Sequence, residues 1–295
     1  MKYPRILAAI RSAKWAVTPN TLQAIRDTLS AHIGGKVSRR VLADASEWAD
    51  SDGKKIEEDH DEGFELIAPG VAQVELCGII GKRLSSMETM CGGCDLEDVE
   101  ENLMEALASP MVSTVILRID SPGGTCNGVL EFSQKIEKLA TESRKPVFAF
   151  IDGQGCSAAY WIACGCNGIA CTPSSDVGSI GVYMALVDES ANWTQEGYKL
   201  VLIKAGELKG AGIAGSQITP AQIAAWQADV DMIYAQFTGS VRAARPGIAD
   251  ETMQGQAFYG PRALEAGLVD KIYNDVGEML DDVAPVVTAP ASFVT

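Results

Sequence analysis

The sequence predicts a mixed α/β domain built from stacked β-α units around parallel strands. From residue 70 onward, short apolar runs alternate with segments whose apolar residues have helical spacing, which is the sequence form of this fold class. Several runs are apolar almost throughout, as expected of strands that are covered on both faces. The composition is globular, with 47% hydrophobic and 21% charged residues.

The expected elements follow from these runs and spacings. The predicted strands are residues 71–80, 112–119, 146–151, 168–171, 180–187, 199–204 and the end of 261–272. Predicted helices cover the Leu96 to Leu107 stripe, residues 127–142, a short stretch after Gly155, and a long segment opened by Thr219 and Pro220. The core stripe of that last helix is Ile223, Trp226, Val230, Ile233, Phe237 and Val241.

Charge divides the chain into regions. Residues 1–43 hold eight Lys or Arg and one acidic residue, and we expect a basic helical N-terminal arm. Residues 44–62 hold nine Asp or Glu and two Lys, so 44–66 are predicted to be an acidic linker. The main domain is expected over 67–275, followed by a flexible C-terminal tail over 276–295.

Composition also excludes several function classes. A net charge of −15 argues against nucleic acid as a partner, because phosphate binding needs a basic face. Neither a signal peptide nor a membrane anchor is recognisable, so we expect a cytoplasmic protein. The eight cysteines are expected to be free thiols, and structural zinc at Cys91 and Cys94 is disfavoured because no second CxxC follows. No metal or cofactor is predicted.

The two histidines, His32 and His60, lie in the arm and the linker, which disfavours a Ser-His-Asp triad. A lysine whose charge is removed by burial is the alternative base for a serine nucleophile. Glycine-rich loops after apolar strands are where such groups lie in parallel α/β proteins, and the sequence offers three of them: IDSPGG, DGQGCSAAYWIA and KAGELKGAG.

Each loop also has an ordinary structural interpretation. Gly123 and Gly124 could form a plain strand-to-helix turn instead of an oxyanion-binding loop. Ser157 could be only the N-cap of a helix, and Lys209 only a solvated surface residue. The combination of the three loops, not any one of them, favours catalysis.

The motifs IDSPGG, GCSAAYWIA, VGSIGV, GELKG and EAGLVDKI, in this order over residues 70 to 275, resemble the signal peptide peptidase A family. Within it the chain looks closest to the phage protein C type head-maturation peptidases, because the MKYPRI arm is similar. The resemblance implies the Clp protease/crotonase-like fold of stacked β-β-α units, with the small N-terminal arm added.

The resemblance implies a Ser–Lys dyad of Ser157 and Lys209, with the amides of Gly124 and Ala158 as the oxyanion hole. Ser179, in VGSIGV, matches a serine that can hydrogen-bond the lysine, and Gly123 supports the loop. The family's lysine is commonly followed by a polar or acidic residue, whereas Gly210 and Ala211 follow Lys209 here, so Lys204 is an alternative base.

The expected function is that of a serine endopeptidase for prohead maturation, cleaving scaffold, itself and portal or capsid proteins inside the immature phage head. A homo-oligomer is expected, because short family members form the dyad between neighbouring protomers. The alternatives are a bacterial cytoplasmic signal-peptide-peptidase-like protease, a crotonase-like acyl-CoA enzyme, and an inactive assembly protein.

Overall fold

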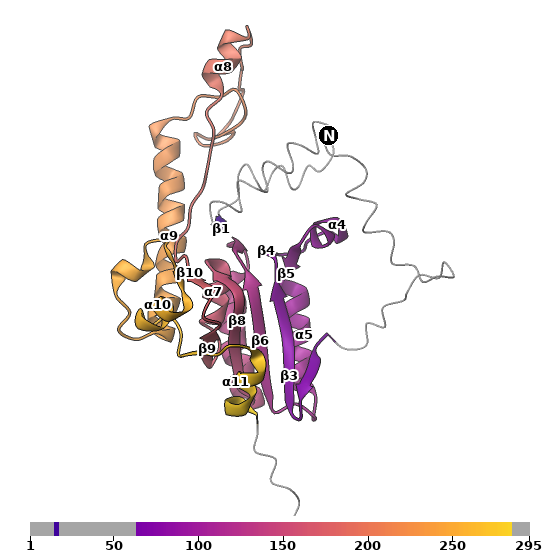
Figure 1. The fold of residues 1–295 in the computed structure, drawn as a ribbon. Coiled ribbons are helices and arrows are strands. Elements are labelled where there is room, and N and C mark those ends of the chain that lie inside the picture. The colour runs from indigo at the N-terminus through magenta and orange to yellow at the C-terminus, as the bar shows by residue number, and fades with distance from the viewer. Residues whose placement is uncertain (1–14, 18–62, 285–295) are drawn as a thin grey trace, which may run out of the picture.

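The computed structural model describes residues 15–17 and 63–284, whose arrangement is shown in Figure 1. The helices are α4 (Ser86–Met90), α5 (Leu96–Ala108), α6 (Val129–Ser143), α7 (Ala158–Ala163), α8 (Ser190–Gln195), α9 (Pro220–Ala244), α10 (Gly260–Glu265) and α11 (Val276–Val283), with one 3-10 turn, η1 (Asp250–Met253). The strands are β1 (Trp15–Val17), β2 (Glu65–Ala68), β3 (Val71–Cys77), β4 (Ile79–Gly81), β5 (Gly93–Asp95), β6 (Thr114–Ser121), β7 (Gly123–Thr125), β8 (Val147–Cys156), β9 (Gly168–Cys171), β10 (Asp176–Gly178), β11 (Ala257–Tyr259) and β12 (Lys271–Ile272).

The larger sheet is mostly parallel, which confirms the predicted fold class. Its strand order is β11-β10-β8-β6-β3-β2, with β9 and β12 added beside β8. The long strand β8 has two parallel neighbours along the same edge: residues 148–151 pair with β9, and residues 154–156 pair with β10. This division lets the end of β8 continue past β9 to the point where Ser157 begins the next turn.

The smaller sheet has the order β1-β7-β4-β5. Gly124 on β7 pairs with Ile80 on β4, and on its other edge β7 pairs antiparallel with β1. The partners are Trp15 with Thr125, Ala16 with Gly124, and Val17 with Gly123. The glycine-rich segment after β6 is therefore an inner strand with a distant part of the chain beside it.

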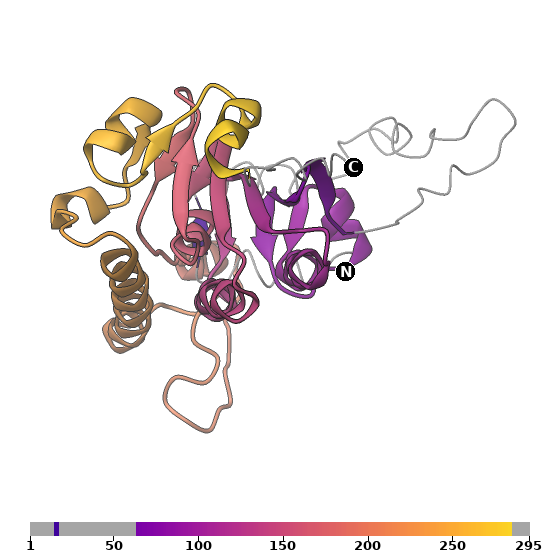
Figure 2. The same ribbon diagram turned by 90° about the horizontal axis from the view of Figure 1, so that it is seen from below.

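The main core lies between the larger sheet and helices α5, α6 and α7, which cover one face of it (Figure 2). A second apolar cluster lies on the other face, where Met279 of α11 packs with Val71, Ile116 and Phe150. Residues 276–283 were predicted to be part of a flexible tail. They form α11 instead, because the amphipathic helix covers apolar side chains of the central strands.

Helix α9 belongs to the domain only through its C-terminal half. Phe237 stacks on Trp161 of α7 with ring centroids 4.6 Å apart, and Phe237 and Val241 are fully buried. Ile223 and Met232 are each 55% exposed, so the predicted core stripe is wrong for Ile223. The projecting segment, defined as residues 183–219 together with the N-terminal half of α9, extends away from the two sheets (Figure 1).

Two predicted strands in and next to the projecting segment are wrong. Residues 180–187 and 199–204 are apolar enough for strands, but none of the strands in the described residues falls there. A strand needs a hydrogen-bonded neighbour, and these segments have left the sheet. The predicted helical arm lies outside the described residues except for Trp15–Val17, which form β1 and not a helix. Most of the acidic linker and the residues beyond 284 also lie outside them.

Candidate active site

Ser157 occupies the sharp turn between β8 and α7. Its backbone has φ +56° and ψ −116°, a conformation that is uncommon for a residue with a side chain and is typical of strained functional turns. Its side chain makes no capping hydrogen bond to α7, so the simple N-cap interpretation is not what the geometry shows. All six residues of α7 are buried, which fixes the helix that begins directly after the serine.

The strand β10 and the loop after it hold Ser157 from the other side. The Ser157 amide donates to the Gly178 carbonyl oxygen at 2.7 Å, and its Oγ donates to the Gly181 carbonyl oxygen at 3.4 Å. Ser179 lies between these two glycines, with φ +51°, and its amide donates to Gln256 at 2.8 Å. The fold therefore brings the VGSIGV motif next to the serine turn.

The IDSPGG loop is fixed by a buried hydroxyl. Ser121 Oγ donates to the Gly78 carbonyl oxygen at 2.6 Å and accepts the Gly123 amide at 3.1 Å. Gly123 has φ +98°, and a Cβ on Gly124 would lie 2.0 Å from the Ile80 carbonyl oxygen. Both positions therefore require glycine, and β7 contacts α7, whose first amide belongs to Ala158.

Lys209 lies in a part of the projecting segment that is exposed throughout residues 201–209. Its amide donates to Gly206 at 3.2 Å, a contact within the same turn. The Lys204 ammonium donates to the Glu207 carbonyl oxygen, again locally. Within the described residues, no hydrogen bond joins Ser157 to either lysine, so the chain by itself brings Ser157, Ser179, Gly124 and Ala158 into one region but leaves Lys209 apart from them.

Comparison with known proteins adds a family assignment. Residues 140–283 match the model of Peptidase family S49, a range that includes both Ser157 and Lys209. A putative protease of Synechocystis sp. is 30% identical over 207 residues, which cover 68% of this chain and 69% of that protein. The chain belongs to peptidase family S49.

Two phage proteins are also similar to this S49 chain. The head-tail preconnector protein GP5 of Enterobacteria phage P21 is 31% identical over 70% of this chain and 42% of its own length. The capsid assembly protease C of Escherichia phage lambda is 24% identical over 92% of this chain and 59% of its own length. The chain thus spans about half the length of these two relatives.

Two solved structures are also similar to this S49 chain in part. A 1510-N membrane-bound stomatin-specific protease mutant with a substrate peptide has a TM-score of 0.39 and 20% identity, covering 73% of this chain and 80% of that one. An enoyl-CoA hydratase/isomerase family member has a TM-score of 0.40 and 18% identity, and the match covers 71% of this chain and 69% of that one.

The thiol of Cys156, next to Ser157 in the chain, is a poor competitor of the serine as a nucleophile. Burial, with a smaller contribution from the charge of Asp176, raises the pKa of Cys156 to about 12. Cys91 is exposed and Cys94 is buried, and burial raises the pKa of Cys94 to about 11.

The described residues contain no group of three or more potential metal ligands. Within the same residues, no helix has the length and apolar character needed to cross a membrane.

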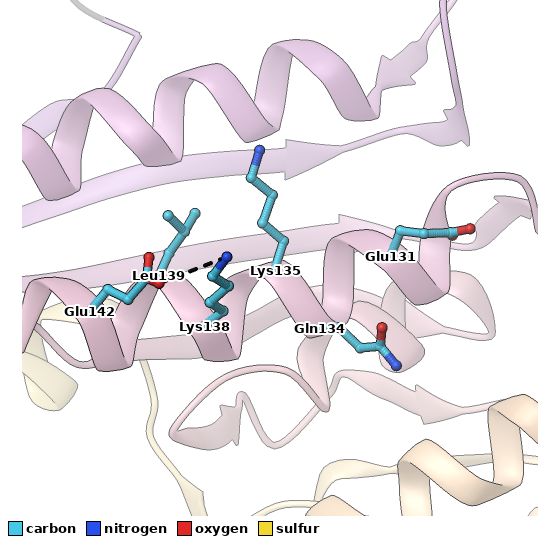
Figure 3. Close-up of a pocket in the computed structure, with 6 residues that line it drawn as sticks. All are labelled: Glu131, Gln134, Lys135, Lys138, Leu139 and Glu142. Carbon is cyan, nitrogen blue, oxygen red and sulfur yellow. Dashed lines mark ion pairs between the residues drawn. The ribbon is translucent and has the colours of Figure 1, made fainter.

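A surface pocket lies along one stripe of α6 (Figure 3). It contains none of the predicted site residues, and its lining consists of Glu131, Gln134, Lys135, Lys138, Leu139 and Glu142. Lys138 and Glu142 form an ion pair of 3.8 Å across it. Five of the six side chains are polar or charged and all come from one helix, so the pocket is not a candidate for peptide cleavage.

Proposed function

We propose that the chain is a serine endopeptidase in which Ser157 attacks the peptide carbonyl and Lys209 is the base. The observation that carries this proposal is the strained turn of Ser157. The Ser157 hydroxyl does not cap α7, and the first turn of that helix begins directly after the serine. Strand-to-helix turns of this kind place a nucleophile beside the backbone amides of a helix N-terminus, which suit a developing oxyanion.

The proposed reaction has two steps. The neutral amine of Lys209 takes the Ser157 Oγ proton, and the oxygen attacks the carbonyl carbon, whose oxyanion is bound by the amides of Gly124 and Ala158. The C–N bond then breaks as the lysine proton passes to the leaving amine. In the second step Lys209 takes a proton from a water, whose oxygen attacks the acyl ester; the ester C–O bond then breaks and the proton passes from Lys209 to Ser157 Oγ, which releases the acid product and restores both residues. Ser179 orients the lysine.

We further propose that Lys209 acts on Ser157 of a neighbouring protomer. A lysine can take a proton only where its charge has been removed by a low-dielectric site, and the exposed projecting segment of one chain does not supply one. The same segment exposes large apolar side chains, which favours burial against another subunit. They are Val187, Tyr198, Val201, Ile203, Leu208 and Ile213, with Ile203 94% exposed.

The proposed substrates are proteins of an immature phage head: scaffold, the peptidase itself, and portal or capsid protein. Support comes from the two phage relatives, whose names describe a capsid assembly protease and a head-tail preconnector. The host cytoplasm and the prohead interior are the corresponding locations. No separate observation favours acyl-CoA chemistry.

The first test is co-expression with phage scaffold, portal and capsid proteins, followed by mass spectrometry of the products. Ser157→Ala and Lys209→Ala should each lower cleavage by roughly 10³-fold or more, as for a nucleophile and its base. Lys204→Ala, on the same exposed loop, is the matched control and should keep most of the activity. Cleavage at the wild-type rate by Ser157→Ala would contradict the proposal. A larger loss of activity in Lys204→Ala than in Lys209→Ala would identify Lys204 as the base.

A further inference from the structure

The strand β1 lies on the glycine-rich strand that the proposed site uses. Trp15–Val17 pair antiparallel with Gly123–Thr125, and Ala16 is directly opposite Gly124. The other edge of β7 is taken by β4, where Ile80 is opposite Gly124. The edge that β1 covers is therefore the one edge of this strand left for any other extended peptide.

An extended peptide is recognised by adding a strand to such an edge, with main-chain hydrogen bonds supplying much of the affinity. A substrate bound to β7 would have its backbone beside Gly124 and close to α7, which contacts β7. Ser157 itself is 1% exposed. Trp15–Val17 and a substrate cannot pair with the same edge together.

We infer that the N-terminal segment around Trp15–Val17 is an intramolecular pseudosubstrate that occupies the peptide-binding edge of β7 and lowers substrate affinity until it is displaced. This inference rests on the proposed function, because it takes the β7 edge to be where substrate binds. The segment is tethered through residues 18–62 to the same domain, so it competes at a high effective concentration. A long substrate or an assembly partner displaces it by mass action.

The test uses a variant that removes the pairing from the full chain. In an antiparallel pair, alternate residues donate their amides to the partner strand, so replacing two consecutive residues by proline removes at least one donor whichever alternation holds. Ala16→Pro/Val17→Pro is this variant. Ala16→Ser/Val17→Thr is the matched control, because it keeps both amides and similar side-chain sizes.

Binding is measured separately from catalysis, in the Ser157→Ala background, with a fluorescein-labelled peptide of residues 10–22 as the probe. If the tethered segment occupies about 90% of the sites, removing it should tighten probe binding about 10-fold, while the serine/threonine control stays unchanged. Hydrogen exchange at Gly123–Thr125 should become faster in the proline variant without the probe and slow again when the probe is added.

The outcomes separate this inference from the proposed function. Tighter probe binding by the proline variant supports the inference, even if no variant cleaves any protein and the catalytic proposal fails. Unchanged probe affinity overturns it, even if Ser157-dependent proteolysis is observed. Wild-type protein that cuts its own chain next to residues 15–17, while Ser157→Ala leaves it whole, also overturns it, because the segment is then a substrate.

Discussion

Ser157 and Lys209 lie in two regions that are stabilised in different ways. The turn of Ser157 is held by the hydrogen bond that its amide donates to Gly178 of β10 and by a helix whose six residues are all buried. Among the residues that the structure describes, the loop of Lys209 has hydrogen bonds only within its own turns, and residues 201–209 are exposed. One chain therefore contains enough contacts to fix the turn of Ser157, whereas within the described residues the loop of Lys209 is fixed only by its own local hydrogen bonds.

The two halves of α9 extend this comparison, because the C-terminal half packs against α7 next to Ser157 and the N-terminal half belongs to the projecting segment. Substitutions in the two halves should give the largest difference in the free energy of unfolding. Phe237→Ala removes a fully buried ring stacked on Trp161, and should lower the free energy of unfolding by about 4 kcal/mol. Ile223→Ala, on the exposed half, should change the unfolding free energy of the isolated chain by less than about 0.5 kcal/mol. Urea denaturation measures both. Equal losses would mean that the projecting half is packed within one chain after all.

Gly124→Ala tests how tightly the serine side is built. The added Cβ would lie 2.0 Å from a backbone oxygen, so we expect a loss of roughly 3 kcal/mol in unfolding free energy, together with reduced cleavage. Gly239→Ala on α9 is the control, because a Cβ there meets nothing within 4 Å. That substitution should stabilise the chain by up to about 1 kcal/mol, since alanine favours helix. A harmless Gly124→Ala would show that β7 is looser than described.

Asp270 links the C-terminal end of α9 to the larger sheet, and its contribution to the free energy of unfolding should depend on pH. It accepts hydrogen bonds from Arg245 at 2.5 and 3.0 Å and from the Ile169 amide at 2.8 Å. Burial is the largest single effect and raises the pKa of Asp270, but the hydrogen bonds from Arg245 and from the Ile169 amide, together with the Arg245 charge, outweigh it and leave the pKa below its usual value. The stabilisation is therefore complete above the unfolded pKa of about 3.9 and is lost as the pH falls through the lower folded value.

Asp270→Asn should accordingly cost about 1.5 kcal/mol at neutral pH, since Arg245 is nearly buried but the Asp270 side chain is 51% exposed and partly screened. The cost should become progressively smaller in acid, as followed by urea denaturation at several pH values. Asp250→Asn is the matched control, because Asp250 pairs with Arg242 at 2.8 Å but is 73% exposed. Its cost should stay below about 1 kcal/mol at every pH. A constant difference between wild type and Asp270→Asn from pH 7 to about pH 3 would argue against the linkage.

The elements around Ser157 were predicted from the sequence better than the segment that contains Lys209, for a physical reason. Apolar runs such as 112–119 and 146–151 became β6 and β8, and the turn after Gly155 became α7, because their contacts lie within one packed domain. The same reasoning predicted strands at 180–187 and 199–204 and a buried Ile223, because apolar residues have the same pattern in the sequence whether the fold buries them or leaves them exposed. The pairing of β1 with β7 was missed, because no local pattern reports which distant edge a short strand will join.

The site residues divide in the same way. The proximity of Ser157 to Gly178 and Gly181 agrees with the ordered motifs, and the strained φ of Ser157 and Ser179 could not be read from residue type, because serine carries no preference for that conformation. The roles of Ser157, Lys209, Ser179, Gly124 and Ala158 stay predictions. The bridging hydroxyl of Ser121 was missed, although its place inside IDSPGG, directly before the glycines that it orients, was a usable signal.

The most direct test of the two-protomer account mixes two inactive proteins. Ser157→Ala and Lys209→Ala are purified separately, dissociated, combined and reassembled, and mixed oligomers are verified by native mass spectrometry. The account predicts that cleavage returns to about a quarter of the wild-type rate, because random pairing places an intact serine beside an intact lysine at that fraction of interfaces. Mixed oligomers that remain as inactive as either parent would contradict it, and would mean that the lysine reaches the serine within one chain.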